Sequence, residues 1–130
     1  MSRESAEELA RRWLSAFDDD PDGFREALHP DIVWLQFEDN HTPSYGIEGA
    51  VRIRNHWLDS WDEMRAEVEE VVGEGDSLVA TVHVTAQGRA SGVEVDVRLY
   101  FHFKVRDDKV AYIYEHQDRA TALEAVGLSE

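Results

Sequence analysis

Two hydrophobic periods divide this sequence into an earlier and a later half. In the earlier half, apolar residues recur every three or four positions, which is typical of one face of a helix. Asp20 and Pro21 suit a helix start, because aspartate caps free amides and proline fits the first helical position. The elements predicted here are helices at 6–17, 21–29 and 46–61, a strand at 32–37 and a loop at 38–44.

In the later half the period changes to two, which is typical of strands that are buried on one face. The predicted strands lie at 64–72, 78–87, 93–106 and 110–117. Asp118 can cap a last helix that ends at Gly127. Helices first and strands later favour an α+β fold, with the helices packed over a curved antiparallel sheet.

The clearest alternation runs from Val93 to Arg106, where odd-numbered residues are apolar and even-numbered residues are polar. The odd face should turn toward the helices, because they carry the other apolar surface of the chain. The even face then meets water or a partner subunit. Its opposite charges at Asp96 and Arg98 suit a two-fold-related copy, so a homodimer through the outer sheet face is expected.

Composition excludes several classes of function. A chain of 130 residues is expected to form a single domain over residues 1–130, and without cysteine it can form no disulfide or thiolate metal site. Its six histidines show no metal-ligand spacing, so no metal is expected. A net charge of −15 disfavours nucleic acid and anionic membranes as partners. No signal-peptide or membrane-spanning pattern is evident, so a cytoplasmic location is expected.

Four segments carry a resemblance to a known family. They are HPDIVW (29–34), YGIEGAVRI (45–53), VEEVVGEGDSLVA (68–80) and VRDDKVAYIYEHQDRATALEAVGL (105–128). With the order of elements, they resemble the SnoaL-like branch of the nuclear transport factor 2-like superfamily. The resemblance implies a cone-shaped half-barrel with a deep hydrophobic pocket, often paired as a dimer. The superfamily contains ketosteroid isomerases, polyketide cyclases, hydrolases and non-catalytic binding modules, so it implies no single activity.

Glu115 is the sharpest catalytic candidate. The run from Lys109 to Glu115 resembles the SnoaL cyclase pattern, whose catalytic aspartate falls at the Glu115 position. The residues that share its strand face are Ala111, Ile113 and Gln117. A carboxyl group on such an apolar face should have a raised pKa, which suits general acid–base work. In the opposite register, the tyrosines and the histidine of this strand face inward and Glu115 meets water.

Gln36 and Tyr45 are candidates to hold a ligand oxygen. In ketosteroid isomerases, as the resemblance aligns them, a base falls near Gln36, an oxyanion-binding tyrosine near Trp13 and a second acid near Phe101. These differences argue against steroid isomerisation but suit Gln36 as a hydrogen-bond donor. Gln36 is otherwise a structural or edge residue. Tyr45 precedes the helix at 46–61, where its hydroxyl group can reach a ligand.

A set of large apolar side chains is available to line the pocket, or else to fill an ordinary core. Its members are Trp13, Phe17, Trp34, Trp57, Trp61, Phe101, Phe103 and Ile113. The sequence therefore leaves three hypotheses. The chain is an enzyme that moves a proton on a hydrophobic small molecule without a cofactor, a non-catalytic binding module, or a dimerising domain with a filled interior.

Overall fold

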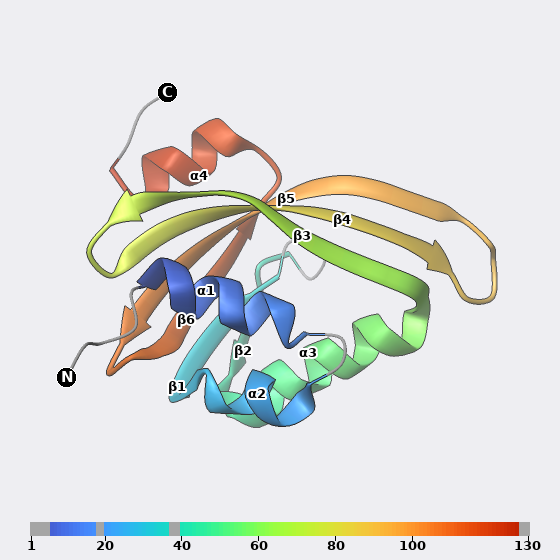
Figure 1. Cartoon of the computed structure of the whole chain (residues 1–130), viewed down its shortest axis with the longest axis horizontal. Coiled ribbons are helices and arrows are strands. Elements are labelled where there is room, and N and C mark those ends of the chain that lie inside the picture. Colours follow the sequence, from blue (N-terminus) through green and yellow to red (C-terminus); the bar gives the residue numbers. More distant parts are fainter. Residues whose placement is uncertain (1–5, 18–19, 37–39, 128–130) are drawn as a thin grey trace.

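The computed structural model describes residues 6–17, 20–36 and 40–127. Figure 1 shows the helices and strands of this part of the chain. Their order is α1 (Ala6–Ser15), α2 (Pro21–Glu26), β1 (Leu28–Leu35), β2 (Pro43–Tyr45), α3 (Gly46–Ser60), β3 (Trp61–Glu74), β4 (Ser77–Gly88), β5 (Glu94–Arg106), β6 (Lys109–His116) and α4 (Arg119–Ala125). No helix in these ranges is long and apolar enough to cross a membrane.

All of these strands join one mixed sheet in the order β2-β1-β6-β5-β4-β3. The expectation of an antiparallel sheet is wrong at one place, because β1 runs parallel to β6. The other neighbours are antiparallel. Strand direction could not be predicted from the pattern, since side chains alternate between the two faces in parallel and antiparallel strands alike. This pairing places the first strand along the chain beside the last one.

Helices α1, α2 and α3 lie on one side of the open sheet and α4 lies on the other (Figure 1). The predicted α+β architecture, with helices over a curved sheet, is therefore confirmed. The largest cluster of buried side chains lies between α1–α3 and the inner face of the sheet, around Trp13, Phe24 and Phe103. A smaller cluster joins α4 to the outer face through Val79 and Leu123.

Several predicted boundaries move. The second helix ends at Glu26, and β1 begins at Leu28, where Leu28 pairs with Val110. A register shift between Leu28 and Val33 lets β1 pass Pro30, which has no N–H to donate. The predicted loop at 38–44 overlaps the short edge strand β2, which begins with a proline, as edge strands tolerate. The predicted strand end at Phe37 lies outside the described residues.

Two irregularities bend β3 over the helices. Its pairing with β4 shifts between Asp62 and Arg65 and again between Val68 and Glu70, and such bulges bend and twist a strand. Glu63 at the first shift has a φ of 52°. The bend carries the far ends of β4 and β5 beyond the helices, as the right-hand side of Figure 1 shows.

The odd-numbered face of β5 is consequently only half covered. Phe101, Phe103 and Val105 are buried as predicted, whereas Val93 is 56% exposed and Val97 is 42% exposed. The prediction that this whole face meets the helical layer is wrong at its first half. The physical reason is length, because the hairpin of β4 and β5 projects past the end of α3 (Figure 1).

Candidate functional site

Glu115 lies inside the molecule, on the face of the sheet that α1–α3 cover. It is 2% exposed, and its neighbour across the strands is Phe101. Its carboxyl Oε2 accepts a hydrogen bond of 2.6 Å from the indole Nε1 of Trp34. The parallel pairing of β1 with β6 makes this contact, because Trp34 lies beside Ile113 in the register. The alternative register, with Glu115 in water, is excluded.

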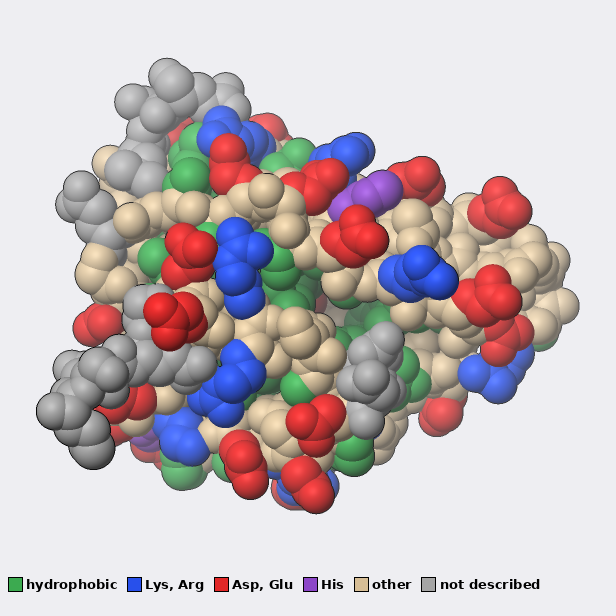
Figure 2. All heavy atoms as spheres, in the orientation of Figure 1, with side chains coloured by type: hydrophobic (Ala, Val, Ile, Leu, Met, Phe, Trp, Pro, Cys, Tyr) green, Lys and Arg blue, Asp and Glu red, His purple; other side chains and the backbone are tan. Residues whose placement is uncertain are grey.

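Glu115 also forms part of the wall of a small cavity. The other walls are apolar and include Leu14, Phe17, Trp34, Trp57, Met64 and Phe101. The volume of this cavity is about 30 Å³, enough for roughly two water molecules. Figure 2 shows the surface hollowed between α1 and β3, with hydrophobic side chains at its floor. The enclosed interior is therefore smaller than the ligand-sized pocket that the sequence suggested.

A wider groove adjoins this cavity at the end of α3. Its volume is about 340 Å³, and it passes between α3 and the projecting part of β5. The residues that line it include Trp57, Trp61, Val95, Val97, Leu99 and Gln117. Trp57, Leu99 and Glu115 line both the cavity and the groove. Glu115 therefore lies where the two spaces meet, and we refer to them below as the inner cavity and the outer groove.

The large apolar residues predicted to line a pocket separate into three groups. Phe17, Trp34, Trp57 and Phe101 line the inner cavity. Trp61 lines the outer groove, with its ring centroid 6.5 Å from that of Trp57. Trp13, Phe103 and Ile113 are fully buried in the core and line neither space. The last three fill the interior, which is why the inner cavity is small.

Gln36 and Tyr45 line neither the inner cavity nor the outer groove. Tyr45 is 69% exposed and pairs with Val33, on the face opposite to that of Trp34. Residues that pair across strands share a face, so the tyrosine points away from Glu115. Gln36 lies beyond the end of β1, and its carbonyl oxygen accepts a hydrogen bond from the backbone N–H of His41. The structure does not bring these two residues together with Glu115.

Two contacts near Glu115 had no signal in the sequence. Trp34 was expected as a pocket wall, and its role as a hydrogen-bond donor depends on a pairing between distant strands. The ring Nε2 of His41 lies 2.7 Å from the backbone carbonyl oxygen of Glu115, and the ring stacks on Tyr114 at 4.2 Å. A carbonyl only accepts, so Nε2 carries the proton. His41 thus fixes the backbone beneath the carboxyl group from the outer face.

The outer face behind Glu115 carries a cluster of aromatic and histidine side chains. His102 is 5% exposed, and its Nε2 lies 3.0 Å from the hydroxyl of Ser77. Burial lowers the pKa of His102 to about 4, with smaller effects from Lys104 and His116. Burial also lowers the pKa of His116 and raises that of Tyr112. These histidines are separated from Glu115 by the sheet, so none forms a dyad with it.

The charged residue at the rim of the outer groove is already paired. Arg98 donates from Nε to Glu69 Oε1 at 2.6 Å and from Nη2 to Glu69 Oε2 at 3.1 Å. This pairing raises the pKa of Arg98 and lowers that of Glu69. Among the described residues, no cluster of three or more histidine, aspartate or glutamate side chains could hold a metal ion. The arrangement offers proton chemistry at one buried carboxyl group in apolar surroundings.

Solved structures share this fold at low sequence identity. A putative SnoaL-like polyketide cyclase from Jannaschia sp. CCS1 aligns with a TM-score of 0.78 at 21% identity, covering 100% of this chain and 99% of that chain. A putative polyketide cyclase from Sinorhizobium meliloti gives 0.70 at 19%, covering 83% and 93%. AclR, a putative hydroxylase from Streptomyces galilaeus, gives 0.71 at 22%, covering 94% and 95%.

Comparison of the sequence with known proteins identifies a family but no activity. No curated protein matches the chain. The SnoaL-like domain family matches residues 10–113, which include part of α1, all of α2 and α3, and most of the sheet with Trp34. With the mixed sheet and the helices on its inner face, this match shows that the chain belongs to the SnoaL-like domain family of the nuclear transport factor 2-like superfamily.

Proposed function

We propose that this SnoaL-like protein binds a hydrophobic small molecule and that Glu115 exchanges a proton with it. The observation that carries the proposal is the buried carboxyl group in the wall of an apolar cavity, oriented by the indole of Trp34. Buried carboxyl groups in apolar sites favour their neutral form, and such groups serve as general acids and bases near neutral pH.

The reaction class that fits is an internal rearrangement beside a carbonyl group. The carboxylate of Glu115 removes a proton from carbon, and the carboxylic acid formed returns that proton to another atom of the same molecule. An isomerisation or a ring closure of this kind needs no oxidant or reductant. The hydrogen bond from Trp34 holds the acceptor oxygen in place while the proton moves.

The test is a comparison of Glu115→Gln with the parent protein on neutral aromatic ketones and phenols, with product formation followed by mass spectrometry. The substitution keeps the size and the hydrogen bond from Trp34 but cannot take a proton, so turnover should fall by at least about 100-fold. Glu124→Gln, the same substitution at an exposed residue of α4, serves as the control for the loss of one acidic group and should leave turnover unchanged. Full turnover by Glu115→Gln would exclude the proposed base.

A second candidate function is binding without chemistry, and the small inner cavity favours it. The outer groove has a larger volume than the inner cavity, and Glu115 is one of several residues that line it. A binder should be stabilised against heat by its ligand through mass action, with no product formed. Stabilisation of the parent and of Glu115→Gln to the same extent, without turnover in either, would support this candidate over the enzyme.

We further propose a homodimer through the outer face of β5 and β6. What supports it is the group of half-buried aromatic side chains there, with the Lys104 Nζ 4.8 Å from the ring of Tyr112. Aromatic side chains are enriched at such interfaces. Sedimentation equilibrium should show a dimer for the parent and a monomer for Tyr112→Asp, and a monomeric parent at micromolar concentration would contradict the proposal.

A further inference from the structure

We infer that His41 is a positioning residue for Glu115 and that it acts on this acid from the loop between β1 and β2. Its ring Nε2 donates a hydrogen bond of 2.7 Å to the backbone carbonyl oxygen of Glu115. His41 lines neither the inner cavity nor the outer groove, so it acts through Glu115 and not on a ligand. The effect on proton exchange rests on the proposed function, whereas the placement of the carboxyl group does not.

Strand β1 ends too early to pair with the backbone of Glu115. Its register with β6 runs as far as Leu35, which pairs with Tyr114, and Gln36 lies beyond the end of the strand. The side chain of His41 therefore provides a donor at the place where the pairing of β1 stops. Backbone carbonyl groups inside a protein need such a partner, because they have lost their hydrogen bonds to water.

The conformation of the loop directs the ring of His41 toward this contact. Asn40 and His41 have φ angles of 52° and 57°, in the left-handed region that asparagine and histidine adopt more readily than most residues. The backbone N–H of His41 donates to the carbonyl oxygen of Gln36 at 2.8 Å, and the ring stacks on Tyr114 with an angle of 12° between the planes. Left-handed residues of this kind persist where surrounding contacts hold them, and they gather at functional sites.

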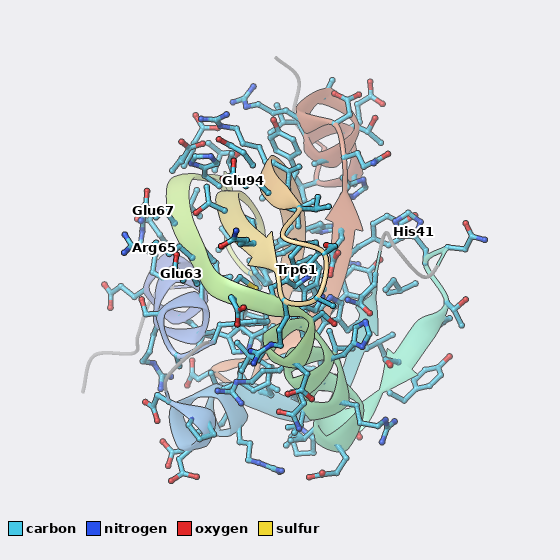
Figure 3. The ribbon with its side chains drawn as sticks, turned by 90° about the vertical axis from the view of Figure 1, so that its right-hand side faces the viewer. His41, Trp61, Glu63, Arg65, Glu67 and Glu94 are labelled. Carbon is cyan, nitrogen blue, oxygen red and sulfur yellow. The ribbon has the colours of Figure 1, made fainter. Side chains whose placement is uncertain are left out.

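Glu115 is consequently held at both ends of its side chain. Trp34 donates to the carboxyl Oε2 at 2.6 Å, and His41 donates to the backbone carbonyl oxygen at 2.7 Å. Figure 3 shows His41 on the side of the sheet where β2 lies, apart from Trp61 and Glu63. A catalytic group must be held within about 0.5 Å of its productive position, so the loss of either contact should displace the carboxyl group.

Two substitutions separate the hydrogen bond of His41 from its other contacts. His41→Gln keeps an N–H donor at the position of Nε2, whereas His41→Asn is one methylene group shorter and does not reach the carbonyl oxygen. Both variants lose the ring that stacks on Tyr114. Asparagine adopts the left-handed backbone more readily than glutamine, so backbone strain acts against the glutamine variant. A recovery in His41→Gln that is absent from His41→Asn therefore measures the donor alone.

The indole N–H signals of the ligand-free protein give the first readout, by proton NMR. In His41→Asn the Trp34 indole proton should exchange with water at least about tenfold faster than in the parent, because its acceptor is held less firmly, and its signal should move upfield. The buried indole of Trp13, which has no hydrogen-bond partner among the described residues, is the internal control and should change by less than about twofold. His41→Gln should restore the Trp34 signal. Equal acceleration of both indoles, or an unchanged Trp34 signal, would overturn the inference.

Turnover gives the second readout. On the neutral aromatic ketones that the parent converts, His41→Asn should lower kcat at least about tenfold and leave KM within about twofold, and His41→Gln should recover most of kcat. Equal kcat values for the parent and His41→Asn would overturn the inference. If the Trp34 signal responds as expected while the parent forms no product, the proposed function fails and the placement of the carboxyl group by His41 stands. The two failures are therefore distinguishable.

Discussion

The hydrogen bond between Trp34 and Glu115 limits how either side chain can change. Both are almost fully buried, and they lie on strands that are distant in sequence. Removing a donor from a buried carboxyl group costs more than an average hydrogen bond is worth, because the acceptor has lost its water. Trp13 offers a contrast, since its buried indole Nε1 has no hydrogen-bond partner among the described residues.

Replacing each tryptophan with phenylalanine should separate these two contributions. Trp34→Phe and Trp13→Phe remove the same atoms from the core, but only the first also removes a hydrogen bond. Trp34→Phe should lower the free energy of unfolding by about 1–3 kcal/mol more than Trp13→Phe does. Urea denaturation of both variants measures the difference. Equal losses would mean that the indole does not stabilise the carboxyl group.

His102 should make the stability of the protein depend on pH. Burial lowers its folded-state pKa to about 4, whereas an unfolded chain has the ordinary value near 6.5. Between these values the unfolded state binds more protons, so the contribution is complete above pH 6.5 and is lost as pH falls toward 4. The loss should reach at most about 3 kcal/mol.

Urea denaturation at several pH values checks this expectation. His102→Gln keeps a polar group near Ser77 but does not titrate, so its stability should depend less on pH between 6.5 and 4. Proton NMR of the parent gives the pKa of His102 itself. An ordinary value in the folded protein would contradict the expectation, whatever the stability shows.

Among the elements, the turn between β3 and β4 sets the register of two long paired strands. Gly73 faces Leu78 and has a φ of 144°, and a Cβ there would lie 2.4 Å from the carbonyl oxygen of Ser77. Gly75 also has a positive φ, of 63°, but a Cβ there would meet nothing within 4 Å. Backbone strain is therefore common to both positions, and steric conflict is specific to Gly73.

Alanine at these two glycines should have unequal effects. Gly75→Ala should cost about 1–2 kcal/mol, from its left-handed backbone alone. Gly73→Ala should cost about 3 kcal/mol or more, because backbone atoms must move as well. Thermal unfolding by circular dichroism gives the comparison. Equal melting temperatures for the two variants would show that the turn accommodates the added methyl group.

The pattern along each element predicted its type and buried face better than its partners. The burial of Phe101 and Phe103 could be predicted, because the alternation of apolar and polar residues is a local property of β5. The parallel pairing of β1 with β6 is not local, so the contact of Trp34 with Glu115 could not be predicted. The exposure of Val97 depends on where α3 ends in space, which the alternation of β5 does not encode. The role of Gln36 was predicted from the family resemblance and that of Tyr45 from its position before a helix, and neither residue lines the inner cavity.

On the scale of the whole molecule, net charge opposes the compact state. The chain has 28 acidic and 13 basic residues, giving a net charge of −15. Ion pairs such as Arg98 with Glu69 and Arg119 with Glu70 are exposed. Exposed pairs contribute about 0–1 kcal/mol each. The stability lost when salt screens these pairs is therefore smaller than the stability gained when salt screens the overall repulsion.

Added salt should therefore stabilise the protein. Raising sodium chloride from about 0.02 to 0.5 M shortens the Debye length from tens of ångströms to a few, which screens the repulsion between acidic side chains. The melting temperature should rise by several degrees, as measured by differential scanning calorimetry at pH 7. A melting temperature that falls with salt would show that the exposed ion pairs outweigh the repulsion.

The parallel pairing of β1 with β6 joins side chains 81 positions apart, at Trp34 and Glu115. Contacts between such distant positions form slowly, because a long stretch of chain must be ordered before they can be made. A ribosome therefore exposes the indole and its apolar neighbours long before the carboxyl group emerges from the exit tunnel. The hydrogen bond between the two side chains can form only after β6 has left the tunnel, so no fragment that ends before Glu115 contains it.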